Sequence, residues 1–112
     1  MTYDLAKPYI ADLDALTQEQ FDLAMKNPGT CRYSSPCIIG ALLPQEVIDQ
    51  LMRDDRDETA IGRITEFVIF KDADQAARAA RIQIAFDMFF SEEDKARAVL
   101  RDELPNLDHS GY

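Results

Sequence analysis

Long apolar runs and basic side chains are the two features that this sequence lacks most clearly. No run approaches the roughly 20 apolar residues that a membrane-spanning helix needs. Residues 1–4 place no basic side chain before an apolar segment, so we expect no signal peptide and a cytoplasmic location. The 112 residues include 12 basic and 21 acidic side chains, a net charge of −9. Nucleic acids and anionic membranes bind basic surfaces, so this composition argues against both. It permits a basic or nucleic-acid-binding protein as partner, and the simpler interpretation is that the acidity keeps a small protein in solution.

Residues with catalytic or metal-binding chemistry are equally few. His109 is the only histidine, and the two cysteines, Cys31 and Cys37, are separated by five residues. A zinc site commonly uses closely spaced cysteines together with further cysteine or histidine ligands, and a nucleophilic cysteine needs a neighbouring base. We therefore expect no metal, no cofactor and no catalytic site, and we interpret Cys37 as a small buried side chain. The sequence leaves open whether the two thiols are free or joined.

Asp87 is the one acidic residue in the almost wholly apolar stretch 84–90. A carboxylate in such a stretch is expected to face solvent at a helix edge or to pair with a cation, and Arg32 is a candidate partner. The alternative is a functional acid with a perturbed pKa. In that case Cys31, Cys37 and Asp87 would mark the site of a small metal- or thiol-dependent enzyme or regulator.

The apolar periodicity predicts an all-α fold, a single compact domain over 1–112 formed by five or six short helices. Thr17 and Gln20 form a capping box, and Asp72 is an N-cap for a long central helix. A second capping box is predicted at 91–94. The expected helices lie within residues 3–14, over about 18–26, over 36–53 with an end or kink at Pro44, over about 60–67, over about 73–90, and over 92–104. Residues 105–112 are expected to form a flexible tail.

Two stretches are less straightforward. Residues 29–44 hold both cysteines, and there Ser35 and Pro36 are expected to start a helix that is buried nearly all round. Gly40 on this helix is interpreted as allowing the helix over 73–90 to approach closely. Residues 67–70 are β-branched and aromatic, which is typical of a strand. Because no partner strand is evident, we favour a helix to about residue 67 and an extended link after it.

Two blocks of the sequence resemble a family of small uncharacterised proteins from phages, prophages and proteobacteria. The first block runs from Cys31, Arg32 and Tyr33 through residues 37–46, and the second covers residues 82–87. Family members tend to have histidine where this chain has Phe86, so the family's histidine–aspartate pair is absent here. The resemblance implies a phage or mobile-element setting and no assigned activity.

The leading hypothesis is a small acidic, non-enzymatic protein that binds a host protein through an acidic face. An inhibitor of a host defence system, similar to the anti-CRISPR proteins, would fit this description. The expected contact residues are Asp54, Asp55, Asp57, Glu58, Glu92, Glu93 and Asp94. Besides the enzyme or regulator described above, a further alternative is a structural subunit that forms a homo-oligomer through the alanines between residues 73 and 80.

Overall fold

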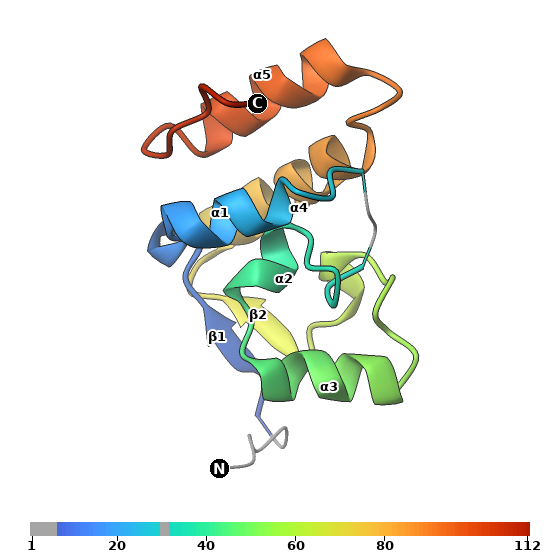
Figure 1. Ribbon diagram of the computed structural model, residues 1–112. Helices are drawn as coiled ribbons and strands as arrows, with labels where there is room; N and C mark the ends of the chain where they lie inside the picture. The colour runs from blue at the N-terminus through green and yellow to red at the C-terminus, as the bar shows by residue number, and fades with distance from the viewer. Residues whose placement is uncertain (1–6, 30–31) are drawn as a thin grey trace.

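Helices make up about half of the structure, and a small parallel sheet accompanies them (Figure 1). The computed structural model describes residues 7–29 and 32–112. Along the described chain, the elements are β1 (Tyr9–Ala11), η1 (Leu13–Ala15), α1 (Gln18–Ala24), α2 (Ile38–Leu42), α3 (Gln45–Arg53), η2 (Ile61–Arg63), β2 (Val68–Phe70), α4 (Ala73–Asp87) and α5 (Glu93–Glu103). No helix in these two ranges is long and apolar enough to cross a membrane.

The sheet corrects the all-α prediction. β1 and β2 pair in parallel, with Tyr9 opposite Val68. The Tyr9 N–H donates to the Phe67 carbonyl at 2.8 Å, and the Lys71 N–H donates to the Ala11 carbonyl at 3.2 Å. The strand-like composition of residues 67–70 therefore corresponds to a strand, β2. Its partner strand, β1, lies in the segment for which a short helix was expected. Two parallel strands need a long crossover connection between them. The sequence near either strand therefore does not indicate which segment it pairs with.

Several helix boundaries agree with the sequence pattern. The capping box at α1 is present, because the Thr17 hydroxyl accepts from the Gln20 N–H and the Gln20 side chain accepts from the Thr17 N–H. α3 occupies the predicted residues 45–53, and the Asp72 carboxylate caps α4 as expected. The predicted helix over 60–67 is wrong: only the 3-10 turn η2 forms there before β2 begins. The predicted second capping box is also wrong, because Glu92 precedes α5 without a side-chain cap.

The stretch that holds the two cysteines differs from the prediction in detail. Cys31 lies outside the described residues. Ser35 and Pro36 are joined by a cis peptide bond ahead of α2 and do not start it, because Cys37 is the N-cap and its sulfur accepts from the Gly40 N–H at 3.3 Å. A Cβ at Gly40 would collide with the backbone of Tyr33. Gly40 is therefore required by the neighbouring loop, and not by α4 as predicted.

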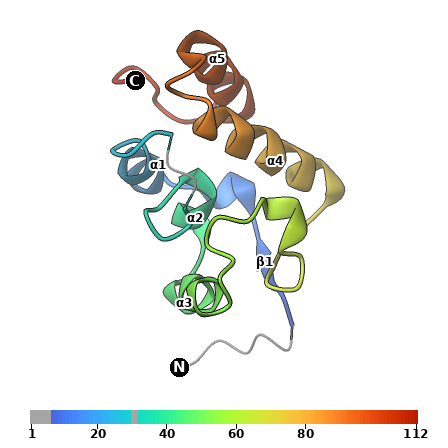
Figure 2. The same ribbon diagram turned by 90° about the vertical axis from the view of Figure 1, so that its right-hand side faces the viewer.

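The core lies where α4 meets the rest of the molecule, as expected for a central helix. α4 contacts α5 on one side and α2, η2 and β2 on the other, and Figure 2 shows it between α5 and the remaining elements. α3 buries Val47, Ile48 and Leu51, whereas Met52 on the same helix is 53% exposed. Residues 105–112 do not extend away as a tail but contact α1.

Candidate functional site

The acidic loop, which we define as residues 54–58, follows α3 at one end of the molecule. Asp54 is the C-cap of α3, and its carboxylate accepts from the Gln50 amide at 3.0 Å. Asp55 adopts a left-handed conformation with φ of 58°, which aspartate tolerates better than most residues. The Arg56 N–H then donates to the Leu51 carbonyl at 2.7 Å and turns the chain back. These local contacts set the path of the first half of the loop.

A second segment, residues 32–34, holds the other half of the acidic loop. The Ser34 N–H and hydroxyl donate to the Asp57 carboxylate at 2.9 and 2.5 Å. The Tyr33 N–H donates to the Asp57 carbonyl at 3.1 Å. Arg32 donates to Glu58 at 2.8 Å, and this hydrogen bond is the main cause that raises the pKa of Arg32. Arg32 thus pairs with Glu58, which corrects the predicted pairing with Asp87.

The acidic loop surrounds a shallow depression of about 420 Å³. It is lined by Arg32, Met52, Asp55, Asp57 and Glu58. Carboxylates attract a cation, and the half-exposed thioether chain of Met52 offers apolar contact to a methylene stem. The chemistry of this depression therefore suits the side chain of a lysine or arginine supplied by another protein.

The second predicted acidic group does not join the first. Glu92, Glu93 and Asp94 lie at the start of α5, and Figures 1 and 2 both show α5 and α3 at opposite ends of the molecule. Glu92 pairs with Lys95 at 3.4 Å and Glu93 with Arg97 at 2.7 Å. The seven predicted contact residues consequently form two separate groups and not one acidic face.

Cys37 and Asp87, two residues of the predicted thiol-dependent site, differ in their exposure to solvent. Cys37 is 3% exposed, and burial is the main cause that raises the pKa of its thiol to about 11. The thiolate, which is the reactive form, is therefore scarce at neutral pH. Asp87 is exposed at the end of α4, and Cys31 lies outside the described residues. Within the described part of the chain, no group of His, Cys, Asp and Glu side chains is arranged to hold a metal ion.

The two sequence blocks that carry the family resemblance meet in space. The Gln83 amide donates to the Tyr33 hydroxyl at 2.9 Å, and this hydroxyl donates to the Thr59 carbonyl. The Ile61 N–H donates to the other end of Gln83 at 2.8 Å. Burial is the main cause that raises the pKa of Tyr33, so its hydroxyl stays protonated. Gln83 and Tyr33 thus attach two segments that flank the acidic loop in space, residues 32–34 and 59–61, to α4.

Phe86 occupies the position at which the predicted family would have histidine. Its side chain is 1% exposed and belongs to the hydrophobic core. The position therefore has a packing role in this chain. The family membership itself remains a prediction.

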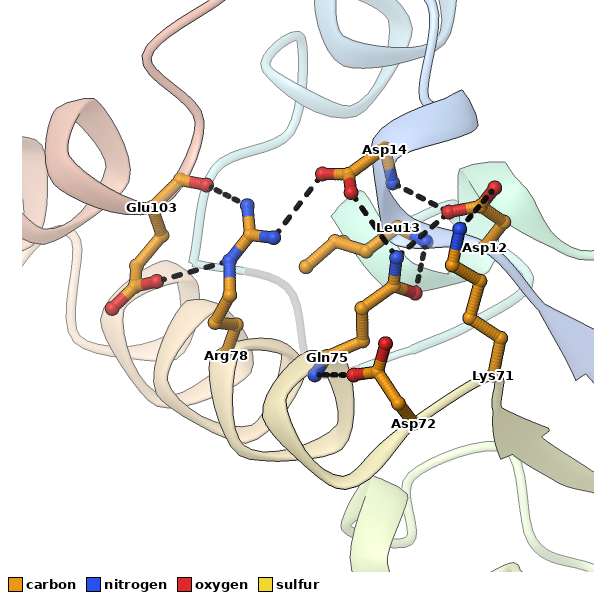
Figure 3. Close-up of polar contacts among 8 residues, drawn as sticks. All are labelled: Asp12, Leu13, Asp14, Lys71, Asp72, Gln75, Arg78 and Glu103. Atoms are coloured by element: carbon orange, nitrogen blue, oxygen red, sulfur yellow. Dashed lines mark hydrogen bonds and ion pairs between the residues drawn. The ribbon is translucent and has the colours of Figure 1, made fainter.

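Sequence reasoning missed the polar cluster around Gln75, the one buried polar side chain in the described residues (Figure 3). Its carbonyl oxygen accepts from the Leu13 N–H at 2.8 Å. Its amide donates to Asp12 at 2.8 Å and to Asp14 at 3.2 Å. The hydrogen bond from Gln75 is the main cause that lowers the pKa of Asp12. No sequence signal distinguishes this glutamine from an exposed one on an alanine-rich helix.

Arg78 extends the same cluster to α5, as Figure 3 also shows. It contacts Asp14 at 3.1 Å and the Glu103 carboxylate at 3.4 Å. Arg81 contacts Glu103 at 2.6 Å, and this hydrogen bond is the main cause that lowers the pKa of Glu103. Gln75, Arg78 and Arg81 each donate to another member of the cluster, so we assign it the role of joining η1, α4 and α5.

No protein-family model matches the chain, and neither a curated protein nor a solved structure was found to be similar to it.

Proposed function

We propose that the protein is a small acidic binding protein without enzymatic activity, and that it docks on a basic or nucleic-acid-binding host protein through the acidic loop. The setting is the phage or mobile element that the family resemblance implies, and a host defence complex is the class of target we propose. The acidic loop is the candidate surface because residues 32–34 hold the carboxylates of Asp57 and Glu58 in position in the free protein. Groups that are ordered before binding lose less entropy on association.

The observation that carries this proposal is the hydrogen bonding between residues 32–34 and the acidic loop. The Asp57 carboxylate accepts a hydrogen bond from Ser34, and the Glu58 carboxylate accepts one from Arg32. The Asp55 side chain, in contrast, is exposed and has no hydrogen-bond partner among the described residues. Asp55 is therefore the carboxylate of the depression that is most available to a partner. The excess negative charge of the chain would also accelerate encounter with a basic surface.

Affinity capture from host lysate at increasing salt concentration tests the proposal. A partner that docks on the acidic loop should be released as ionic strength rises, because salt screens exposed charges. Asp55→Asn keeps the left-handed backbone and removes only the charge, so it should weaken capture by roughly tenfold, the effect of losing about 1.4 kcal/mol. Asp94→Asn, the same change at the opposite end of the molecule, should leave capture unchanged. Equal effects of the two variants would contradict the proposal.

A second candidate function, assembly into a homo-oligomer, is favoured by an apolar depression of about 290 Å³ between β2 and α4. The exposed alanines Ala73 and Ala76 line it beside Ile69. Ile10 is the neighbour of Ile69 on the sheet, and the two are 62% and 37% exposed. A second copy could cover this apolar surface. Sedimentation velocity tests it: Ala76→Glu should dissociate an oligomer, and a wild-type monomer at all concentrations would exclude this function.

A further inference from the structure

Residues 105–112, which we call the return segment, bind to one face of α1. Gln18, Phe21 and Asp22 are spaced three and four residues apart, so they lie on the same side of this helix. Each of the three contacts the return segment, and the contacts join residues up to 90 positions apart in sequence. α1 therefore presents a small contact surface to a segment that is remote in the chain.

Gln18 contacts the main chain of the return segment. Its amide N–H donates to the Asp108 carbonyl at 3.0 Å, and its carbonyl accepts from the Asp108 N–H at 2.7 Å. A side-chain amide that satisfies both groups of one residue recognises an extended backbone independently of the side chain that it carries. This pairing resembles the main-chain recognition seen when a peptide adds to a protein surface.

Phe21 and Asp22 contact the side chains of the return segment. The Phe21 ring, which is fully buried, packs edge-to-face against His109 and Tyr112 with centroids 5.0 and 5.4 Å apart. The Tyr112 hydroxyl donates to the Asp22 carboxylate at 2.7 Å, and this bond is the main cause that raises the pKa of Tyr112. Aromatic contacts combined with one charge-assisted hydrogen bond are a common basis for selective peptide binding.

The return segment has its own internal order. The Ser110 N–H donates to the Asp108 carboxylate at 2.9 Å, and the Tyr112 N–H donates to the His109 carbonyl at 3.0 Å. Leu104 is buried at the end of α5, whereas Pro105 and the residue after it are exposed. The Leu104 carbonyl accepts from the Leu107 N–H at 3.3 Å and lies 2.7 Å from His109 Nε2. A change of direction after Leu104 breaks these two contacts at the end of α5 and leaves the helix itself intact, which is the geometry that permits a segment to be exchanged between copies.

We propose that Gln18, Phe21 and Asp22 form a peptide-binding site on α1, occupied here by the return segment of the same chain and able to accept the return segment of a second copy. Exchange between copies preserves the contacts of Gln18, Phe21 and Asp22 with the return segment. The covalent connection gives the chain's own segment a high effective concentration, on the order of millimolar, so the occupied monomer is the resting state. A second copy binds when the chain's own segment is displaced.

Two full-length variants divide the site between two chains. The first, His109→Ala with Tyr112→Ala, keeps α1 and loses both rings of the return segment. The second, Gln18→Glu with Asp22→Ala, keeps the return segment and loses its donor and acceptor on α1. Sedimentation velocity of an equimolar mixture should show a complex of one copy of each variant that neither variant forms alone. A mixture whose profile is the sum of the two separate profiles would overturn the proposal.

Glu19→Gln provides the matched control, because Glu19 neighbours Gln18 on α1 and contacts no residue of the return segment in the described chain. Mixed with the first variant, this control should form at least tenfold less complex, since its own return segment remains bound. Equal complex formation by the control would show that the copies associate elsewhere and would overturn the proposal.

A synthetic peptide of residues 105–112 gives a measurement that does not depend on the second variant. In an NMR titration it should shift the α1 amide signals of the first variant at a concentration at least tenfold lower than for the wild type, whose site is occupied. Tyr112→Phe, which removes only the hydroxyl, should give an intermediate midpoint and replaces the first variant if that one does not fold. Equal midpoints for wild type and variants, or no shift of α1 signals, would overturn the proposal.

Discussion

The two acidic groups of this protein are similar in composition and different in structure. The acidic loop is held by hydrogen bonds from residues 32–34, which are more than 20 positions away in sequence. Glu92 and Glu93 instead pair with residues three and four positions ahead on the same helix. Long-range contacts fix the first group in a defined shape, whereas local pairs on a helix surface contribute little. A run of carboxylates therefore acquires a defined arrangement through the residues that position it.

The largest loss of stability is expected from Gly40→Ala, which disturbs the segment that holds the acidic loop. The new Cβ would collide with the backbone of Tyr33, which supplies a hydrogen bond to the acidic loop. We expect a loss of about 3 kcal/mol in the free energy of unfolding, measured by urea denaturation. Gly62→Ala is the control, because a Cβ there meets nothing within 4 Å. Equal losses for the two variants would show that the contact between α2 and Tyr33 is not tight.

A smaller effect is expected from Tyr33→Phe. The change leaves the Gln83 amide and the Thr59 carbonyl without the hydroxyl that joins them. An unsatisfied, partly buried polar group costs on the order of 1–2 kcal/mol, and we expect urea denaturation to report a loss of about that size. A change within the error of the measurement would mean that water replaces the hydroxyl and that this link does not position the loops.

Asp57→Ala and Glu93→Ala compare the two acidic groups directly. Asp57 loses two hydrogen bonds from Ser34, so we expect a loss of about 1 kcal/mol in the free energy of unfolding. Glu93 loses one pair with Arg97 on an exposed helix face, which is worth only about 0.3–0.5 kcal/mol. Should Glu93→Ala prove the more destabilising variant, the distinction between the two groups would be wrong.

The smallest effect concerns acid stability through Glu103. Its pKa is lowered in the folded protein, mainly by the hydrogen bond from Arg81. A lowered folded-state pKa stabilises the fold above the unfolded-state pKa, near 4, and this contribution is lost as the pH falls through the folded-state value. Thermal melts of Glu103→Gln should therefore depend less on pH below about pH 4 than those of the wild type. An unchanged pH dependence would show that the pairing does not contribute.

How well a contact could be predicted from the sequence depends on how far apart its two residues lie along the chain. The capping box of Thr17 and the cap of Asp72 were predicted because their partners lie within four residues. The pairing of Tyr9 with Val68 was missed because neither strand contains information about the other. Each of the two strands is also too short for an alternating pattern to be recognised.

The same distinction applies to the candidate site. The charge run of residues 54–58 is visible in the sequence, and it forms an exposed loop. The contacts of Arg32 and Ser34 with this loop are not visible, because arginine and serine have many possible partners and only the fold selects among them. The binding of the return segment to Gln18 is not visible in the sequence for the same reason, because a glutamine on α1 has many possible partners.

Hydrogen exchange tests most directly the claim that the acidic loop is ordered in the free protein. The amides of Tyr33, Ser34 and Arg56 donate to Asp57 or Leu51, so they should exchange far more slowly than unstructured peptides. The amides of Glu93 and Asp94 belong to the first turn of α5, where N–H groups have no intrahelical acceptor, and they should exchange rapidly. Rapid exchange at Tyr33, Ser34 and Arg56, equal to that at Glu93 and Asp94, would contradict the account.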